Sequence, residues 1–325
     1  MVIGKKKELF VIFKVNKIFL IFKMFLILRI FSISLITIFI FGFSYAGEIS
    51  DKLVSKATSV AEEKIEFAVN DLFNNVEINL SGFNEGKPEY GLSTILPIYD
   101  MDNRVSFFQG SFSTQADIET LNLGFGQRHL LKNNTILIGA NAFYDLDLEN
   151  SHERWSLGAD LLTSVGDIHA NFYEAITDFK LDKNGNKEFT LGGFDVALGF
   201  PVPYLPNSKV YAEAFSWNGI NNSSDLEGET YSLKNEFPYG LTVEFGKTSY
   251  DKMNQDQEFI SLSINFLEWN KPHKPFKYEI ASMISTEPFS MEFKDVSERR
   301  FEKVKRENKI KKQTNRTGTV RIVGY

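Results

Sequence analysis

Apolar and polar positions alternate along most of the chain between residues 76 and 266. In the segment Glu258–Phe266, Ile260 and Leu262 share one face while Ser261 and Ser263 share the other. A period of two is typical of β-strands with one apolar and one polar face. Polar turn residues separate the segments. The pattern predicts twelve strands: Val76–Gly82, Glu89–Tyr99, Arg104–Ser113, Ile118–Arg128, Thr135–Leu146, Arg154–Ser164, Asp167–Asp178, Glu188–Phe200, Ser208–Trp217, Gly228–Phe237, Gly240–Ser249 and Glu258–Phe266.

The stretch "LNLGFGQRHLL" contains a Gly-Phe-Gly that a motif search could take for a phosphate-binding loop. A dinucleotide fingerprint needs a third glycine three residues after the second. Here His129 stands three residues after Gly126, so the fingerprint fails. Leu123 and Phe125 alternate with Gly124 and Gly126, which is again the period of a strand. We interpret this segment as part of a sheet.

The length and number of the segments favour a membrane barrel over a soluble β-sandwich, which would also alternate. Strands of about 9–11 residues cross a bilayer, and bacterial outer-membrane barrels have an even number of them. Lipid cannot satisfy an open sheet edge, so such a sheet must close. We therefore predict an all-β fold, a twelve-stranded antiparallel transmembrane β-barrel. Aromatic residues near strand ends are expected to form interfacial girdles: Tyr99, Phe143, Tyr144, Trp155, Phe200, Trp217, Tyr239 and Phe266.

The N-terminal segment Met1–Ala46 has the pattern of a signal peptide. Basic residues precede the apolar run "IFSISLITIFIFGF", and small residues at Ser44 and Ala46 suit cleavage before Gly47. Met24 is an alternative start, and an uncleaved membrane anchor is an alternative interpretation. Residues 47–75 carry apolar positions at spacings of three and four, which predicts a short periplasmic helix. The expected divisions are 1–46, 47–75, a barrel at 76–267 and a basic linker or tail at 268–325.

Charge is distributed unevenly along the chain. Met1–Ala46 carries seven basic residues and one acidic residue, and Met291–Tyr325 carries eleven basic and five acidic residues. Since the whole chain has a net charge of −6 and each of these two segments has +6, the body between them has −18. An exported chain with this balance is not expected to bind nucleic acid.

The residues needed for most metal and catalytic sites are missing or scattered. The sequence contains no cysteine, which excludes disulfides, thiol catalysis and cysteine metal sites, and its four histidines have no ligand spacing. We therefore expect no cofactor and no metal site. His152 has Ser151 and Glu153 as neighbours in sequence, but sequence neighbours do not make a catalytic triad. We predict no enzymatic activity.

Five stretches together resemble the β-domain of inverse autotransporters, the intimin and invasin family. They are "LPIYD", "GFGQR", "IGANAFYDLDL", "HERWSLGADLL" and "GGFDVALGFPVPYLPNSKVYAEAF", they follow the family's order, and the resemblance covers the twelve-strand region. The residues that carry it include Pro97, Tyr99, Asp100, Gln127, Arg128, Asn141, Phe143, Asp145, Gly193, Asp195, Pro203 and Pro206. After the barrel, "RRFEKVKRENKI" is similar to the family's linker.

The resemblance implies an outer-membrane barrel whose linker passes back through the pore and carries a passenger to the cell surface. The 18 residues from Asn308 to Tyr325 leave no room for an immunoglobulin-like passenger domain. The resemblance therefore implies a translocator that displays its tail or exports a separately encoded passenger. A passive channel plugged by the tail and a truncated adhesin anchor are the alternatives. Expected partners are outer-membrane lipid, the outer-membrane assembly machinery and periplasmic chaperones.

The uneven distribution of charge suggests where the basic linker lies in the barrel. We expect its basic residues to lie in a lumen lined partly by acidic side chains such as Asp160, Asp195 and Glu244, because confinement in a pore strengthens such attraction. The alternative is that these charges lie on loops and on a solvated tail. The five basic residues are Arg299, Arg300, Lys303, Lys305 and Arg306. Four glycines in the strands are expected to leave packing space: Gly124, Gly126, Gly139 and Gly158.

Overall fold

The computed structural model describes residues 76–81, 89–115, 118–182, 184–221, 223–251, 256–269, 279, 282–288, 292–316 and 319–323. The predicted signal peptide and periplasmic helix lie outside these residues. No helix in the described ranges is long and apolar enough to span a membrane. All described residues belong to one compact unit.

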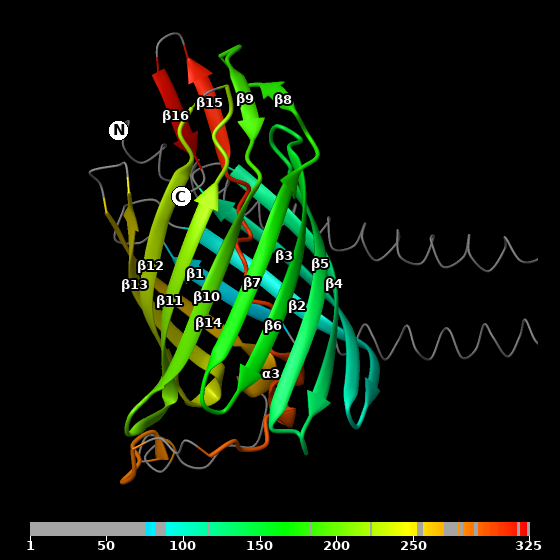
Figure 1. Cartoon of the computed structure of the whole chain (residues 1–325), viewed down its shortest axis with the longest axis vertical. Coiled ribbons are helices and arrows are strands. Elements are labelled where there is room, and N and C mark those ends of the chain that lie inside the picture. Colours follow the sequence, from blue (N-terminus) through cyan, green and yellow to red (C-terminus); the bar gives the residue numbers. More distant parts are fainter. Residues whose placement is uncertain are drawn as a thin grey trace, which may run out of the picture. The chain divides into compact units, whose positions relative to one another are not determined.

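Twelve antiparallel strands form a closed barrel (Figure 1), which confirms the predicted fold class. Each strand pairs with its neighbour along the barrel, and the first strand also pairs with the last, so no edge is left open. The strands are β1 (Val76–Ser81), β2 (Glu89–Met101), β3 (Arg104–Gln115), β4 (Ile118–Leu131), β5 (Ile136–Asp147), β6 (Glu153–Thr163), β7 (Asp167–Ala175), β10 (Gly193–Val202), β11 (Leu205–Trp217), β12 (Leu226–Glu236), β13 (Leu241–Tyr250) and β14 (Gln257–Asn265).

The two ends of the barrel differ in the length of their connections. At one end, here called the turn end, the connections between successive strands are two to four residues long. One of them contains the 3-10 turn η1 (Pro238–Gly240), and the short helix α3 (Phe266–Trp269) follows β14 at the same end. At the other end, the loop end, the connection from β7 to β10 contains two further strands, β8 (Phe179–Leu181) and β9 (Lys187–Thr190).

The alternation along each strand separates a lumen face from a lipid face. On β4, Leu123 and Phe125 are 44% and 46% exposed, whereas Asn122 is fully buried. Leu157 on β6 and Phe172 on β7 are likewise exposed. Since the outward residues are apolar and the inward ones are largely polar, the barrel is inside-out relative to a soluble protein, as a membrane barrel must be.

Apolar side chains inside the lumen form three small clusters. One lies towards the loop end and includes Tyr173 and Trp217. Another joins Phe107 and Phe143 to Val304, a residue beyond the last barrel strand. A third contains Val296, again from beyond the barrel strands. The chain that follows β14 therefore takes part in the packing of the barrel interior.

Two sequence predictions need correction. The segment Glu188–Phe200 is not one strand, because β9 and β10 belong to different sheets. Phe143 and Trp217 are not interfacial residues, because they are 4% and 2% exposed and pack in the lumen clusters. Alternation alone cannot tell which face of a strand an aromatic side chain joins when both faces of the barrel wall contain rings.

The C-terminal segment forms two strands that the sequence pattern did not predict. β15 (Lys312–Arg316) pairs with β9, and β16 (Thr319–Val323) pairs with β15. Together with β8 they make a four-stranded sheet beyond the loop end of the barrel (Figure 1). The β15–β16 hairpin of the tail thus pairs with the β8–β9 hairpin of the β7–β10 connection.

The two glycines of β4 face the lumen directly beneath aromatic rings. A Cβ on Gly124 would lie 2.3 Å from the ring of Phe143, and a Cβ on Gly126 would lie 2.3 Å from the ring of Phe107. A side chain at either position would displace a ring that packs against the interior. The rings of Phe143 and Phe107 can lie flat against the wall because these positions have no side chain.

We expect Gly124→Ala to destabilise the folded barrel by about 1–3 kcal/mol through overpacking. Gly110→Ala on β3 is the matched control, because a Cβ there meets nothing closer than 4.0 Å. Urea unfolding in detergent, followed by the gel shift of the folded barrel, measures both. Equal midpoints for the two variants would contradict the packing argument.

Candidate functional site

A stretch of chain passes through the barrel lumen from the turn end to the loop end. We call residues 296–311 the linker. At the turn end, the Val296 amide donates to the carbonyl of Asn134 over 2.8 Å, and the 3-10 turn η2 (Ser297–Phe301) follows. At the loop end, the amide of Leu191 donates to the carbonyl of Lys311 over 2.9 Å. The linker therefore spans the whole barrel.

Side chains of the wall bind the main chain of the linker. The Val304 amide donates to Gln109, and the Glu307 amide donates to the Tyr173 hydroxyl. Wall donors reach linker carbonyls at 2.8 to 3.1 Å: Arg154 to Glu307, Asn122 to Asn308, Asn171 to Lys305 and Arg128 to Arg300. These contacts satisfy backbone groups that have no sheet or helix partner.

Each of the five predicted basic residues faces a carboxylate of the barrel. Arg299 contacts both carboxylate oxygens of Asp167, at 2.7 and 2.8 Å. The remaining pairs are Arg300 with Asp100 at 3.0 Å, Lys303 with Glu77 at 3.0 Å, Lys305 with Glu213 at 3.9 Å and Arg306 with Asp145 at 2.6 Å. A bidentate arginine–carboxylate pair fixes geometry as well as charge.

Asp145 is the central anion of the lumen. It accepts from Arg306 at 2.6 and 2.9 Å and from Arg154 at 2.8 and 2.9 Å, and all three side chains are fully buried. The guanidinium of Arg306 lies 4.3 Å from the centre of the Phe143 ring, and that of Arg154 lies 4.4 Å from the centre of the Tyr173 ring. Carboxylate and aromatic faces together compensate for the loss of water around two cations.

The carboxylates that the sequence singled out have other partners. Asp160 binds Arg128 at 3.0 Å and His169 at 2.9 Å. Asp195 accepts from Tyr173 and Asn171, and Glu244 accepts from Ser232. These residues line the lumen, but the carboxylates that contact the five basic residues are a different set. Proximity across a barrel depends on register, which charge counting does not reveal.

The other motif residues lie at turns, bulges and wall positions. Pro97 and Tyr99 flank a register shift between β2 and β3, and the Gln127 amide donates to Ser106. Both amide atoms of Asn141 are buried without a hydrogen-bond partner among the described residues. Gly193 cannot carry a Cβ, which would lie 2.2 Å from the Ser216 carbonyl. Pro203 lies in the turn between β10 and β11, and Pro206 is the second residue of β11.

A second cluster fixes the linker where it leaves the loop end. We call β9, β15 and the side chains of Asp147, His152, Glu188 and Lys312 the clasp. The Lys312 ammonium is 1% exposed and contacts Asp147 at 2.9 Å and Glu188 at 3.1 Å. His152 binds Glu188 at 3.1 Å through Nε2 and Thr190 at 2.8 Å through Nδ1. The structure thus places His152 in the clasp, with Glu188 and not Ser151 as its partner.

The clasp holds Glu188 in its ionised form. Burial disfavours the charged carboxylate, but the hydrogen bond from His152 and the charge of Lys312 outweigh it and lower the pKa to about 2. The Asn150 amide adds a further hydrogen bond at 2.9 Å. A carboxylate that is charged at neutral pH suits a buried lysine, since neither ion then lacks a partner.

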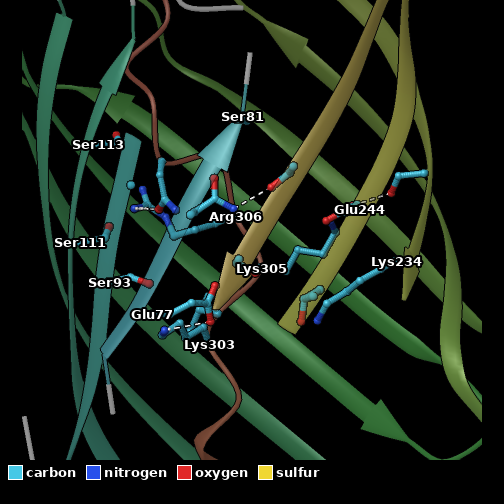
Figure 2. A pocket seen from close by; sticks show the side chains of 18 of the residues that line it. Glu77, Ser81, Ser93, Ser111, Ser113, Lys234, Glu244, Lys303, Lys305 and Arg306 are labelled. Carbon is cyan, nitrogen blue, oxygen red and sulfur yellow. Dashed lines mark hydrogen bonds and ion pairs between the residues drawn. The ribbon is translucent and has the colours of Figure 1, made fainter. Parts of the chain in front are cut away.

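The linker leaves part of the lumen unfilled. A hollow of about 1260 Å³ lies beside it, lined by β1–β3 and β11–β14 and by the linker itself. Figure 2 shows Lys303, Lys305 and Arg306 of the linker among the wall side chains of this hollow. The main-chain contacts described above come chiefly from β3–β7 instead. The linker therefore follows one side of a wide barrel and leaves the other side open.

Most of the chain matches a known protein family. A model of the inverse autotransporter β-domain matches residues 43–308. The chain belongs to this family. The resemblance read from the sequence motifs is confirmed, and the inverse autotransporter β-domain places the protein in the outer membrane of a Gram-negative bacterium.

Curated relatives of this inverse autotransporter domain match over part of their length. A putative attaching and effacing protein homolog of Escherichia coli strain K12 is 32% identical over 117 residues, covering 35% of this chain and 39% of the relative. Intimin of Citrobacter freundii is 27% identical over 136 residues, covering 41% of this chain and 14% of intimin. The chain thus spans less than half the length of these relatives.

A solved structure shares the fold. A membrane protein from a study of in-meso crystallisation superposes with a TM-score of 0.62 at 20% identity, covering 74% of this chain and 99% of that chain. At this identity the likeness concerns the fold alone. The inverse autotransporter barrel is therefore supported by the family model and by this structural likeness.

Sequence reasoning missed the wall and clasp residues that complete the site. Arg154 and Tyr173 bind the linker main chain, and Glu188 and Lys312 form the clasp. Arg154 stands inside the quoted stretch "HERWSLGADLL", and its polar-face position on an alternating strand was an available signal. No local signal marks the tail as a strand, since β15 forms by pairing with β9.

We expect Asp145→Asn to destabilise the folded protein by about 3–5 kcal/mol, because two buried guanidiniums lose their shared carboxylate. The control Asp100→Asn removes the partner of Arg300 where both side chains are 30–41% exposed, and should cost about 1 kcal/mol or less. Urea unfolding in detergent measures both. Similar losses for the two variants would argue against Asp145 as the central anion.

The clasp should weaken in acid. The pKa of Glu188 is lower in the folded protein than the ordinary value of 4.5. The stabilisation that its charge gives to the clasp is therefore present above pH 4.5 and is lost as the pH falls towards about 2. Hydrogen exchange of the Leu191 amide, corrected for the intrinsic rate, reports the β9–tail contact. Glu188→Gln should remove this part of the pH dependence. A variant with the same acid profile as the parent would exclude Glu188 as the titrating group.

Proposed function

We propose that the barrel is an inverse-autotransporter translocator that holds its own linker in the pore and presents the following chain at the cell surface. The observation that carries the proposal is the linker, which enters at the turn end, contacts the wall along its length and emerges at the loop end. The geometry is that of a chain held in transit. The barrel is the anchor, and the tail is the displayed element.

The orientation follows from the lengths of the connections. Outer-membrane barrels have short periplasmic turns and longer extracellular loops. The turn end, with connections of two to four residues, accordingly faces the periplasm, and the loop end faces outwards. The clasp then lies at the cell surface, where it stops the linker from sliding back.

The wall of the barrel binds the main chain of the linker, which supports a role in the passage of a polypeptide through the pore. Gln109, Asn122 and Asn171 bind amides and carbonyls of the linker rather than side chains. Any residue except proline offers the same two groups. A wall of this kind can accommodate different sequences as they pass, whereas the ion pairs of Arg299 and Arg306 fix the final register.

The proposed partners follow from the fold and the family. Outer-membrane lipid surrounds the apolar face of the barrel. Insertion by the outer-membrane assembly machinery, with periplasmic chaperones before it, is the route that we propose. The names of the relatives, intimin and attaching and effacing protein homolog, favour attachment as the purpose of display, by a segment of this chain or by a separately encoded passenger.

Surface shaving of intact cells tests the proposal. An epitope placed after Tyr325 should be removed by added protease, while an epitope in the Asp102–Asn103 turn should be protected until the outer membrane is opened. Fractionation confirms that both variants reach the outer membrane. A protected C-terminal epitope in a correctly inserted barrel would contradict display, and would favour a channel whose tail acts as a plug.

A further inference from the structure

The hollow beside the linker runs the length of the barrel. Its lining includes Leu226 and Glu236 from the two ends of β12, and Thr242 and Tyr250 from the two ends of β13. Twelve strands enclose a lumen wider than the eight-stranded barrels that side chains can fill. One extended linker occupies part of that cross-section, and the remainder follows the barrel axis beside it.

The lining of the hollow is polar. Hydroxyl groups face it from six strands: Ser81 of β1, Ser93 of β2, Ser111 and Ser113 of β3, Ser232 of β12, Thr242 of β13 and Ser261 of β14. Figure 2 shows four of these serines in the lining. Hydroxyls can replace part of the hydration of an ion without fixing it in place, so such a surface holds mobile water rather than a packed core.

The charges around the hollow are predominantly negative. Ten acidic side chains line it against seven basic ones. Of those seven, Arg306 pairs with Asp145, which lies outside the lining, and Arg299 is shared between Asp167 outside the lining and Glu302 within it. A confined polar path with surplus carboxylates attracts cations and repels anions.

Glu244 carries that surplus most directly. It faces the hollow from β13 and accepts a hydrogen bond of 2.6 Å from Ser232. None of the ion pairs between described residues includes Glu244, whereas Glu77 and Glu89 are each paired with a linker lysine. Its charge is therefore available to a mobile ion.

We propose that this barrel conducts small cations along the hollow while the linker remains in place. The path lies between the linker and the wall of β1–β3 and β11–β14. Lysines of the linker cross it to reach the wall, as Lys309 does to Glu89 over 2.6 Å near the loop end. These lysine side chains narrow the path, so the conductance is small. The inference concerns ion passage and does not rest on surface display.

Planar bilayer recordings of the full chain under a potassium chloride gradient test this. The folded state is verified beforehand by the gel shift on heating. The parent protein should show a reversal potential on the cation-selective side. Glu244→Gln, which keeps the Ser232 hydrogen bond, should lower the cation-to-anion permeability ratio by roughly twofold. Glu229→Gln, an exposed position on the same strand pair, is the control and should leave the ratio unchanged.

A second variant acts in the opposite direction. Lys309→Met removes one positive charge from the path and leaves the Glu89 carboxylate without its lysine partner, so conductance and cation preference should both rise. Folded protein without conductance, anion preference in the parent, or a reversal potential that Glu244→Gln leaves unchanged would each overturn the proposal. Display measured by shaving can succeed or fail independently of these recordings.

Discussion

Beyond η2 the linker is an extended chain with no helix or sheet partner, so its buried amides and carbonyls need hydrogen bonds from the wall or from water. Most of the lumen can be understood from this constraint. Gln109, Asn122, Asn171 and Tyr173 act as a side-chain substitute for a neighbouring strand. The polar inward face of the barrel therefore serves the linker as much as it serves water.

The positive charges of the linker also need carboxylate partners, and this second requirement influences which part of the lumen is packed and which is hollow. The buried arginine pairs lie on the wall that carries Asp145 and Asp167, and the linker follows that wall, while Lys303 and Lys305 reach Glu77 and Glu213 across the lumen. The opposite wall, rich in serine and threonine, is left without a packed partner. Barrel width, linker thickness and the placement of acidic residues together determine where the interior is dense and where it is hollow.

The twelve strands could be predicted from the sequence because lipid imposes a strict alternation, visible at Leu123 and Phe125. The family motifs pointed to Asp145 and Arg128, but their partners could not be predicted. Asp145 meets Arg306 across 161 positions of sequence, and only the register of a closed barrel brings them together. The clasp was missed for a similar reason: β15 is a strand because β9 offers an edge, not because its own residues alternate. The domain boundaries at 46, 75 and 267 stay predictions.

The clasp has a mechanical consequence. In the proposed orientation, an outward pull on β15 acts along the β9–β15 strands and along the linker, so backbone bonds, the Lys312 contacts and the arginine pairs are loaded in shear. Contacts that share a load fail at a higher force than contacts that open one after another. If the chain is displayed as proposed, the anchorage is strongest against an outward pull, although each contact taken alone is modest.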